Sequence, residues 1–395
     1  MNDVSRTAAR TGGFSLVELM VSVVIGLLAV LFATRIMTDN ERNKDAALGG
    51  ANSMQNGMSA MFSINGDVEQ AGFGLNDPLL VGCNTIFNDS EGYQLPAATR
   101  GAAATAVRPL APVLIESGGT GSDRLTTMAG SAAGGTPVLR LNANYNNGST
   151  TLVVDRVPYG FYVGDAIVVA PEVVGADCAL AQVARDPNLD PPPGQQQLRI
   201  GGAGLRFNNG GLGAQYTGNT ARIFNLGPGE KLAFHTWSVE RGFLRLRSTD
   251  MAGAGAASQP VADNIVLFKA QYGFDRRTSA IFSAATSNQV DTWSPTMIDA
   301  DNNGVIGSPG DYGRIAALRL GIVARSRYPQ KPPAGSQCNA TTVAPTLFGS
   351  AQPGNVAAVP VTLGLAVQGD ALDWKCYTYR VFETVAPLRN AGWRP

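Results

Sequence analysis

The hydrophobic pattern divides the chain into an apolar run, a helical stripe and a long region of short segments. Residues 14–34 are apolar or small, with Glu18 as the single charge. A helix of this length, rising about 1.5 Å per residue, crosses the roughly 30 Å hydrocarbon core of a bilayer. The pattern predicts a transmembrane helix over 14–34, because a cleaved secretory signal has a shorter, uncharged apolar core.

A second helical segment is predicted over residues 35–74. Gly72 or Gly74 is expected to end it, because glycine accepts the left-handed conformation that closes many helices. A row of apolar residues along one side of a helix is more often the seam between the helix and its own domain than a ligand groove, so we expect this helix to pack on the rest of the chain. Apolar residues recur there at spacings of three and four, at Ala47, Ala51, Met54, Met58, Met61, Ile64, Val68 and Ala71.

From residue 75 onward, short β-rich segments between Gly, Pro, Asn and Asp replace the helical period. Several alternate apolar and polar residues, as antiparallel strands with one wet face do. Residues 75–395 are therefore predicted to form one large, mainly antiparallel β head, and the fold class is α+β. The candidate strands are 113–115, 124–128, 138–141, 151–154, 166–170, 198–200, 221–224, 232–239, 243–247, 264–272, 315–324 and 374–382.

Charge sets the expected orientation and argues against nucleic-acid binding. The chain has 30 basic and 30 acidic residues, with a formal net charge of zero. Proteins that bind duplexes gather basic residues to replace phosphate counterions, and no such excess exists here. Arg6 and Arg10 precede the apolar run, so the positive-inside rule places residues 1–13 in the cytoplasm and the head outside.

Glu18 is the unusual residue of the apolar run. A carboxylate inside a membrane span costs a few kcal/mol unless it is protonated, paired or able to reach the headgroups. Such a residue is a functional hypothesis by default, although its place near the helix end also allows it simply to reach the interface.

The residues around Glu18 match a known processing site. Gly13, Phe14 and Glu18 stand in the order Gly-Phe-Ser-Leu-Val-Glu after a short basic leader. This segment resembles the type IV prepilin site, with Glu at the fifth position after the cleavage point. The resemblance implies that a prepilin peptidase cuts between Gly13 and Phe14 and that the new amine of Phe14 is methylated. It also implies that Glu18 pairs with the Phe14 amine of a neighbouring subunit.

The C-terminal third extends the resemblance, to minor pilins of the PilW type. Three segments are similar to the ordered blocks of that family: 261–275, 315–326 and 380–390. The middle of the chain, 75–260, is matched only loosely. The resemblance implies a pilin-like fold, partnership with other minor and major pilins, and a single-pass inner-membrane protein whose periplasmic head later joins the pilus, or fimbrium.

All four cysteines lie on the side predicted to be outside the cytoplasm, where disulfides form: Cys83, Cys178, Cys338 and Cys376. Four cysteines allow three connectivities, and we favour the pairing of sequence neighbours, Cys83 with Cys178 and Cys338 with Cys376. A zinc site is the weaker interpretation, because the chain has no CxxC pair and His235 is its single histidine.

One acidic loop has the spacing of a calcium site. Its oxygen ligands would come from alternate residues and a later carboxylate: Asp299, Asp301, Asn303, Val305 and Asp311. Gly310 occupies the twelfth place, where a calcium loop usually has a bidentate Glu, so Asp311 would have to substitute. The competing interpretation is a turn built from Asp, Asn and Gly.

Catalysis finds no support in the sequence. His235 lies in a strand-like run, and no serine in a nucleophile elbow accompanies it. We therefore expect a non-enzymatic minor pilin that acts in type IV pilus assembly, priming or capping the filament through its helix. The alternatives are a pseudopilin of a type II secretion system and a pilus-associated adhesin whose residues 75–260 bind a surface glycan or protein.

Overall fold

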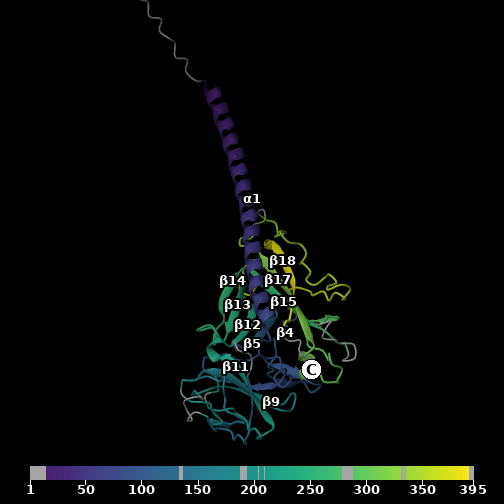
Figure 1. Ribbon diagram of the computed structural model, residues 1–395. Helices are drawn as coiled ribbons and strands as arrows, with labels where there is room; N and C mark the ends of the chain where they lie inside the picture. The colour runs from purple at the N-terminus through teal and green to yellow at the C-terminus, as the bar shows by residue number, and fades with distance from the viewer. Residues whose placement is uncertain are drawn as a thin grey trace, which may run out of the picture. The chain divides into compact units, whose positions relative to one another are not determined.

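The computed structural model contains one long helix and a β-rich head (Figure 1). It describes residues 15–132, 137–186, 194–202, 204–208, 210–277, 288–330, 332 and 335–390. Contacts divide the chain into two units, Met1–Ala51 and Asn52–Pro395, and each is considered by itself. Helix α1 (Leu16–Gln70) belongs to both, so the second half of the helix is part of the compact head.

In the first unit, α1 is a bare apolar helix. Its segment Leu16–Thr38 is the one candidate membrane span among the described residues, and none of it is buried against protein. Apolar side chains left bare in this way would be unfavourable in water but suit a hydrocarbon environment. This segment agrees with the predicted span over 14–34, extended slightly at its C-terminal end.

Helix α1 ends at the predicted place. Its last residue is Gln70, and Gly72 and Gly74 follow with φ values of 83° and 73°. The side-chain amide of Asn390, 320 residues away from Gln70, donates to the Glu69, Gln70 and Ala71 carbonyls. The C-terminal segment therefore satisfies carbonyl groups that the end of a helix leaves without intrahelical partners.

Two of the sheets enclose the second half of α1. One has the order β14-β13-β12-β5-β4 and the other β16-β15-β17-β18, with every pairing antiparallel. Their strands are β4 (Val113–Glu116), β5 (Arg124–Ala129), β12 (Ala233–Glu240), β13 (Phe243–Ser248), β14 (Gln259–Asp263), β15 (Ile265–Phe274), β16 (Thr292–Ser294), β17 (Ile315–Arg325) and β18 (Tyr379–Pro387).

A third large sheet forms the part of the head built from the middle of the chain. Its order is β1-β9-β8-β11-β6, antiparallel except for the parallel pair β1-β9. Its strands, and those of two small hairpin-like pairs, are β1 (Asn84–Ile86), β2 (Ala98–Arg100), β3 (Thr105–Val107), β6 (Val138–Arg140), β7 (Thr151–Val153), β8 (Asp165–Pro171), β9 (Asp177–Gln182), β10 (Gln197–Arg199) and β11 (Ala221–Pro228). Short helices are η1 (Gly229–Lys231), α2 (Pro309–Tyr312) and η3 (Trp374–Cys376).

Two of the apolar clusters of the head differ in whether they include α1, and a further cluster joins residues of β8 and β11 to residues of β5 and β12. Ala60, Ile64, Val68 and Ala71 of α1 join one cluster with residues of β4, β12, β15 and β17. A different cluster, including Phe161 and Ile223, lies within the middle region and contains no residue of α1. The sheets that hold the helix thus have a core that is distinct from this one.

The predicted seam of α1 was only partly right. Ile64 and Val68 are fully buried, but Met54 and Met58 are 48% and 54% exposed. The buried face instead uses small residues, among them Ser53, Gly57 and Ala60. The reason is close packing, since a Cβ atom added at Gly57 would overlap the ring of Phe382 on β18.

The strand pattern was mostly correct, with particular omissions. The prediction missed β1, β2, β3, β9, β14 and β16. It also placed a strand over 374–382, whereas Trp374–Cys376 form a 3-10 turn capped by the Asp373 carboxylate and β18 begins at Tyr379. Polar capping of the Lys375 amide, 2.9 Å from Asp373 Oδ1, competes locally with strand formation.

The disulfides join Cys83 to Cys178 and Cys338 to Cys376. The first links the end of the turn after α1 to β9, and both of its cysteines are fully buried. The second links the segment after β17 to η3, next to the start of β18. Each closes a loop, so each removes conformational freedom from the unfolded chain.

The contact at Gly57 yields a stability prediction. Gly57→Ala should lower the free energy of unfolding by about 1–3 kcal/mol through overlap with Phe382, partly offset by about 1 kcal/mol of better helix propensity. Gly66→Ala is the matched control, because nothing lies within 4 Å of a Cβ added there. Denaturant unfolding of the full chain in detergent measures both variants. Equal stabilisation by the two substitutions would contradict a close approach at Gly57.

Candidate functional site

Glu18 lies in the first turn of α1 and is exposed, like the apolar residues around it. Its backbone carbonyl accepts a hydrogen bond of 2.6 Å from Ser22 Oγ, and no contact of its carboxylate occurs among the described residues. A carboxylate on a bare apolar helix is unfavourable inside a membrane unless it is protonated, paired or able to reach the headgroups. Gly13 and Phe14, the residues of the predicted cleavage site, lie outside the described residues.

A cluster of polar side chains fastens the second half of α1 to the head. Asp67 on α1 accepts from His235 Nδ1 at 2.8 Å and from Trp237 Nε1 at 2.7 Å, both on β12. The other ring nitrogen of His235, Nε2, lies 2.8 Å from Asp250 Oδ1. One imidazole thus joins a carboxylate on the helix to a carboxylate that follows β13.

The two carboxylates favour the charged imidazole. Burial alone would lower the pKa of His235, but the hydrogen bonds and charges of Asp250 and Asp67 outweigh it and raise the pKa to about 9. Burial tends to raise the pKa of Asp250, and the contact with His235 brings it below its usual range. At neutral pH the raised pKa of His235 and the lowered pKa of Asp250 therefore favour an imidazolium beside the Asp250 carboxylate.

The sequence placed His235 in a strand, but its partners Asp67 and Asp250 were not predicted. Asp67 lies 168 residues and Asp250 15 residues from His235 in sequence, and nothing in a strand pattern identifies either carboxylate. A usable signal did exist, because His235 and Trp237 are two residues apart and so point to the same face of β12. Their ring nitrogens required an acceptor on whatever element covers that face.

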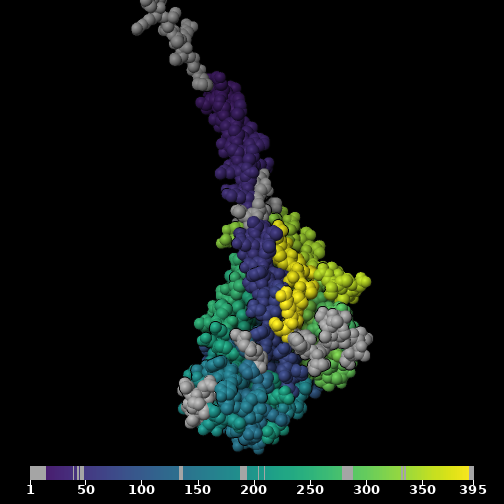
Figure 2. Space-filling view, in the orientation of Figure 1, coloured from purple at the N-terminus to yellow at the C-terminus, as the bar shows by residue number. Residues whose placement is uncertain are grey.

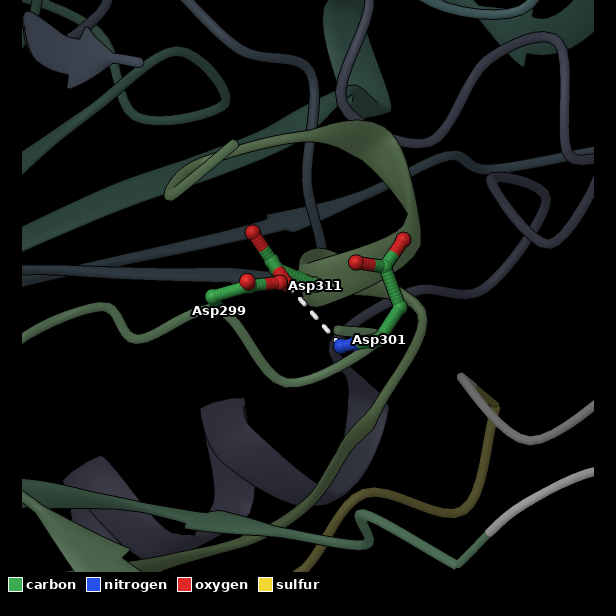
Figure 3. A group of neighbouring side chains, drawn as sticks. All are labelled: Asp299, Asp301 and Asp311. Atoms are coloured by element: carbon green, nitrogen blue, oxygen red, sulfur yellow. Dashed lines mark hydrogen bonds between the residues drawn. The ribbon is translucent and has the colours of Figure 1, made fainter. Parts of the chain in front are cut away.

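The acidic loop brings its carboxylates together as predicted. Oxygen atoms of Asp299, Asp301 and Asp311 lie within 4.8 Å of one another (Figure 3). Asp311 is fully buried at the start of α2, where it accepts from the Ala300 amide at 2.6 Å and the Ser308 amide at 3.0 Å. Burial raises the pKa of Asp311, although these backbone bonds oppose the shift.

The same loop also satisfies its own acceptors. Asp299 accepts from the amides of Asn303 and Gly304 at 3.0 and 2.9 Å. The amide of Val305 donates to Asn303 Oδ1 at 2.7 Å. Asp301 accepts from the side chain of Asn303 at 2.9 Å. The carboxylate grouping fits a hard cation, and the hydrogen bonds fit a self-supporting turn.

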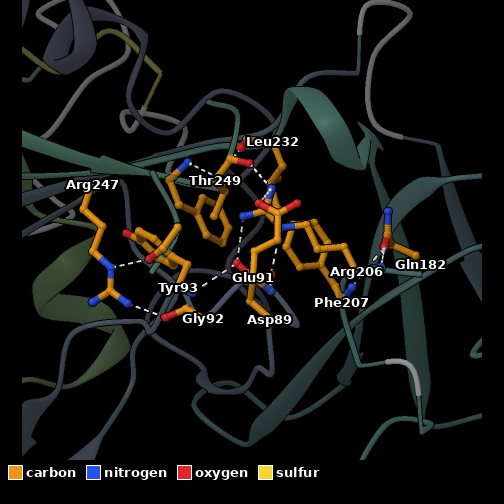
Figure 4. A network of polar contacts seen from close by, with 12 residues as sticks. Asp89, Glu91, Gly92, Tyr93, Gln182, Arg206, Phe207, Leu232, Arg247 and Thr249 are labelled. Carbon is orange, nitrogen blue, oxygen red and sulfur yellow. Dashed lines mark hydrogen bonds and ion pairs between the residues drawn. The ribbon is translucent and has the colours of Figure 1, made fainter. Parts of the chain in front are cut away.

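A partly buried polar network joins the middle region to β13 (Figure 4). Arg206 makes two hydrogen bonds of 2.8 Å to Asp89 and a 3.2 Å ion pair with Glu91. The guanidinium also donates to the Thr249 carbonyl just after β13, and Arg247 of β13 donates to the Gly92 carbonyl. Charged partners neutralise one another here, and the network contains no paired nucleophile and base. Its role is to hold two regions of the head together.

The histidine cluster gives a pH dependence. The folded-state pKa of His235, about 9, exceeds the ordinary value of 6.5, so its stabilisation is full below pH 6.5 and is lost as pH rises through 9. The shift corresponds to about 3 kcal/mol. Asp250 acts oppositely, because its stabilisation is present above its ordinary pKa and lost as pH falls below it.

We expect the free energy of unfolding to decline between about pH 7 and pH 10, and His235→Gln to flatten that decline. Urea unfolding of the full chain in detergent across this range is the measurement. Tyr and Lys side chains also titrate near pH 10. The quantity compared is therefore the difference in the free energy of unfolding between the original protein and His235→Gln at each pH. An unchanged slope in the variant would show that His235 is not charged in the folded protein.

The calcium hypothesis makes its own prediction. Calcium at about 1 mM, the range of extracellular calcium modules, should raise the unfolding temperature, and Asp299→Asn should remove that increase. Asp155→Asn, which changes a carboxylate on the β7–β8 connection, is the control. Differential scanning fluorimetry with and without chelator distinguishes the hypotheses, because the turn interpretation expects no shift in any variant.

Comparison with known proteins identifies the C-terminal region. Residues 236–390 match the family model described as Type IV Pilus-assembly protein W. Neither a curated protein nor a solved structure matches the chain. The matched region begins within β12 and includes β13 to β18, most of the strands that enclose α1. Residues 236–390 are thus similar to the PilW-like family of type IV pilus-assembly proteins.

Proposed function

We propose that this protein is a minor pilin that enters type IV pili at their priming or capping position through the N-terminal half of α1. The family match supports a role in pilus assembly. The observation that carries the finer proposal is the bare apolar segment Leu16–Thr38, which contains Glu18 near its start. Such a segment suits first a bilayer and then the apolar interior of a helical filament.

Glu18 would act as the registration point of assembly. Removal of the leader after Gly13 creates an amine on Phe14, and burying either charge alone in an apolar interior is prohibitive. Pairing the Glu18 carboxylate with the amine of a neighbouring subunit neutralises both. Because breaking one partner of a buried pair costs about 3–5 kcal/mol, the pair favours one axial register over its alternatives.

The head would remain exposed while the helix is held in the filament. The seam at Gly57 and the Asp67–His235 contact fix α1 to the head at separate turns of the helix. Forces on the filament are then carried by packing and ion pairing within one compact unit. This arrangement needs no catalytic group, so we propose a structural protein, partnered by other pilins and processed by a prepilin peptidase in the inner membrane.

A type II secretion pseudopilin would use the same anchor and the same processing chemistry. The match to a pilus-assembly family favours the pilus. Recovery of the protein in filaments sheared from the cell surface would support a pilin, whereas its retention with the secretion machinery would support a pseudopilin.

The pairing role of Glu18 is tested by substitution. Glu18→Ala should insert into the membrane and be cleaved normally but should be depleted about tenfold or more from sheared filaments, because the neighbouring amine loses its partner. Ser22→Ala is the control, since it removes only the hydrogen bond to the Glu18 carbonyl in the same turn region. Immunoblots of sheared filaments and mass spectrometry of the mature N-terminus provide the readout. Normal incorporation of Glu18→Ala would refute the pairing role.

A further inference from the structure

Strand β18 forms a long open edge of its sheet. Its nine residues pair with β17 in continuous register, without a bulge. The other edges of the three larger sheets, within the described residues, are three to five residues long: β1, β4, β6, β14 and β16. Strand β14 is further interrupted by Pro260 and a register shift. Proteins usually shorten, charge or cover strand edges because such edges recruit other strands.

The direction of the β18 backbone can be assigned. The Ser326 amide donates to the Thr378 carbonyl at 2.8 Å, and the Leu388 amide donates to the Ala316 carbonyl at 3.0 Å. Hydrogen bonding alternates along an antiparallel pair, so the even-numbered residues of β18 face β17. The amides of Tyr379, Val381, Glu383 and Val385 therefore point outward, where no backbone partner occurs among the described residues.

An apolar side of α1 lies next to this edge. Asn56 donates to Asp263 of β14, and Gly57 lies against Phe382 of β18. Successive residues of a helix are about 100° apart around its axis, so Asn56 faces β14, Gly57 faces β18, and Met58 lies 100° further in the same direction. Met58 is therefore on the side of the open edge of β18. Met54, Met58 and Phe62 recur there at every fourth residue and are 48%, 54% and 81% exposed. Figure 2 shows β18 and this part of α1 side by side at the surface.

The exposed polar residues Gln55 and Ser59 lie further around the helix than Met54, Met58 and Phe62, toward the β14 side. The apolar stripe Met54–Met58–Phe62 thus lies on the side of α1 that adjoins the open strand edge, with the part-exposed Asn65 and Glu69 following it along the helix. The stripe and the outward edge of β18 together are called the edge surface below.

We propose that this edge surface binds an extended segment of a second protein, which adds as a strand to β18. Outward amides and carbonyls are matched only by another extended backbone. Because side chains of a strand alternate between faces, every second residue of that segment would contact Met54, Met58 and Phe62, and those residues should be apolar. The inference concerns the head alone and does not depend on the role of Glu18.

A second copy of this chain is a poorer occupant than a different protein. Pairing two β18 strands over their full length about a two-fold axis would place Glu383 opposite itself. Like charges directly opposed across strands are destabilising. Glu383 also already accepts from Arg319 at 2.9 Å and from the Phe348 amide at 2.8 Å, so it is held in place rather than able to turn away.

Photo-crosslinking of the full chain in living cells tests the proposal. Benzoylphenylalanine is introduced at Phe62 or Val381, and at Ser59 as the control, and the crosslinked peptides are identified by mass spectrometry. We expect Phe62 and Val381 to capture one segment of the same protein, with apolar residues at alternate positions, and Ser59 not to capture it. Capture of this chain itself, of a membrane-spanning helix, or of nothing at these positions would overturn the proposal.

Substitutions then test the edge itself. Val381→Pro removes an outward amide while sparing the bonds to β17, and it should reduce the crosslink from Phe62 about tenfold, as expected from losing one or two backbone hydrogen bonds. Val381→Thr keeps the amide and should leave the crosslink within about twofold. An undiminished crosslink in Val381→Pro would show that the stripe binds its partner without the strand edge.

Loss of protease resistance or of the Cys338–Cys376 disulfide would reveal that Val381→Pro does not fold. A substitution on the helix provides the test in that case. Met58→Asp should reduce capture from Val381 about tenfold by placing a charge in the apolar stripe, whereas Ser59→Asp on the neighbouring polar side should not. Equal crosslinking in the two variants would exclude the apolar stripe from the site.

Discussion

The close approach of α1 to its two sheets is the constraint on which the head depends. A helix that is apolar on one face can join a sheet core only as near as its side chains allow. Gly57 removes the one Cβ atom that would overlap Phe382, and Ser53 and Ala60 keep the same face narrow. The larger Ile64 and Val68 then fill the wider space between the sheets.

Polar contacts add direction to this apolar seam. Packing alone would tolerate small rotations of the helix, because apolar contact is not directional. Asp67 removes that freedom by accepting from both His235 and Trp237 on β12, and Asn56 bonds to β14 about three turns earlier. With the rotation fixed, Met54, Met58 and Phe62 are left on the outer side. The exposed stripe is therefore a consequence of what the buried face requires.

Elements with strong periodicity could be predicted from the sequence, and elements fixed by distant partners could not. Alternation in β13 and the long apolar runs of β15 and β17 are sufficient to identify these three segments as strands. Strand β9 was missed because its six residues include two alanines and bury five positions in succession, without a clear period. Strand β14 was missed because Pro260 argues against a strand unless it lies at an edge.

The candidate site shows the same division. Glu18 stands out because a charge in an apolar run is anomalous in any context, and the acidic loop stands out through local spacing. Asp67, Asp250 and Asn390 contact residues that no local pattern links to them. The seam prediction included Met54 and Met58 because size and apolarity do not reveal which side of a helix needs small residues. Register and close approach are tertiary properties.

The matched region and the apolar clusters divide the head differently. Most of β12 and all of β13 to β18 lie in residues 236–390, and most of these strands enclose α1. The middle region has a cluster of its own, is tied internally by Cys83–Cys178, and reaches β13 partly through the ion pair of Arg206 with the buried Asp89. A further cluster joins Val168 and Phe224 of the middle region to Met128 of β5 and Phe234 of β12. The middle region therefore packs directly on two of the strands that hold the helix, and the two parts of the head depend on each other.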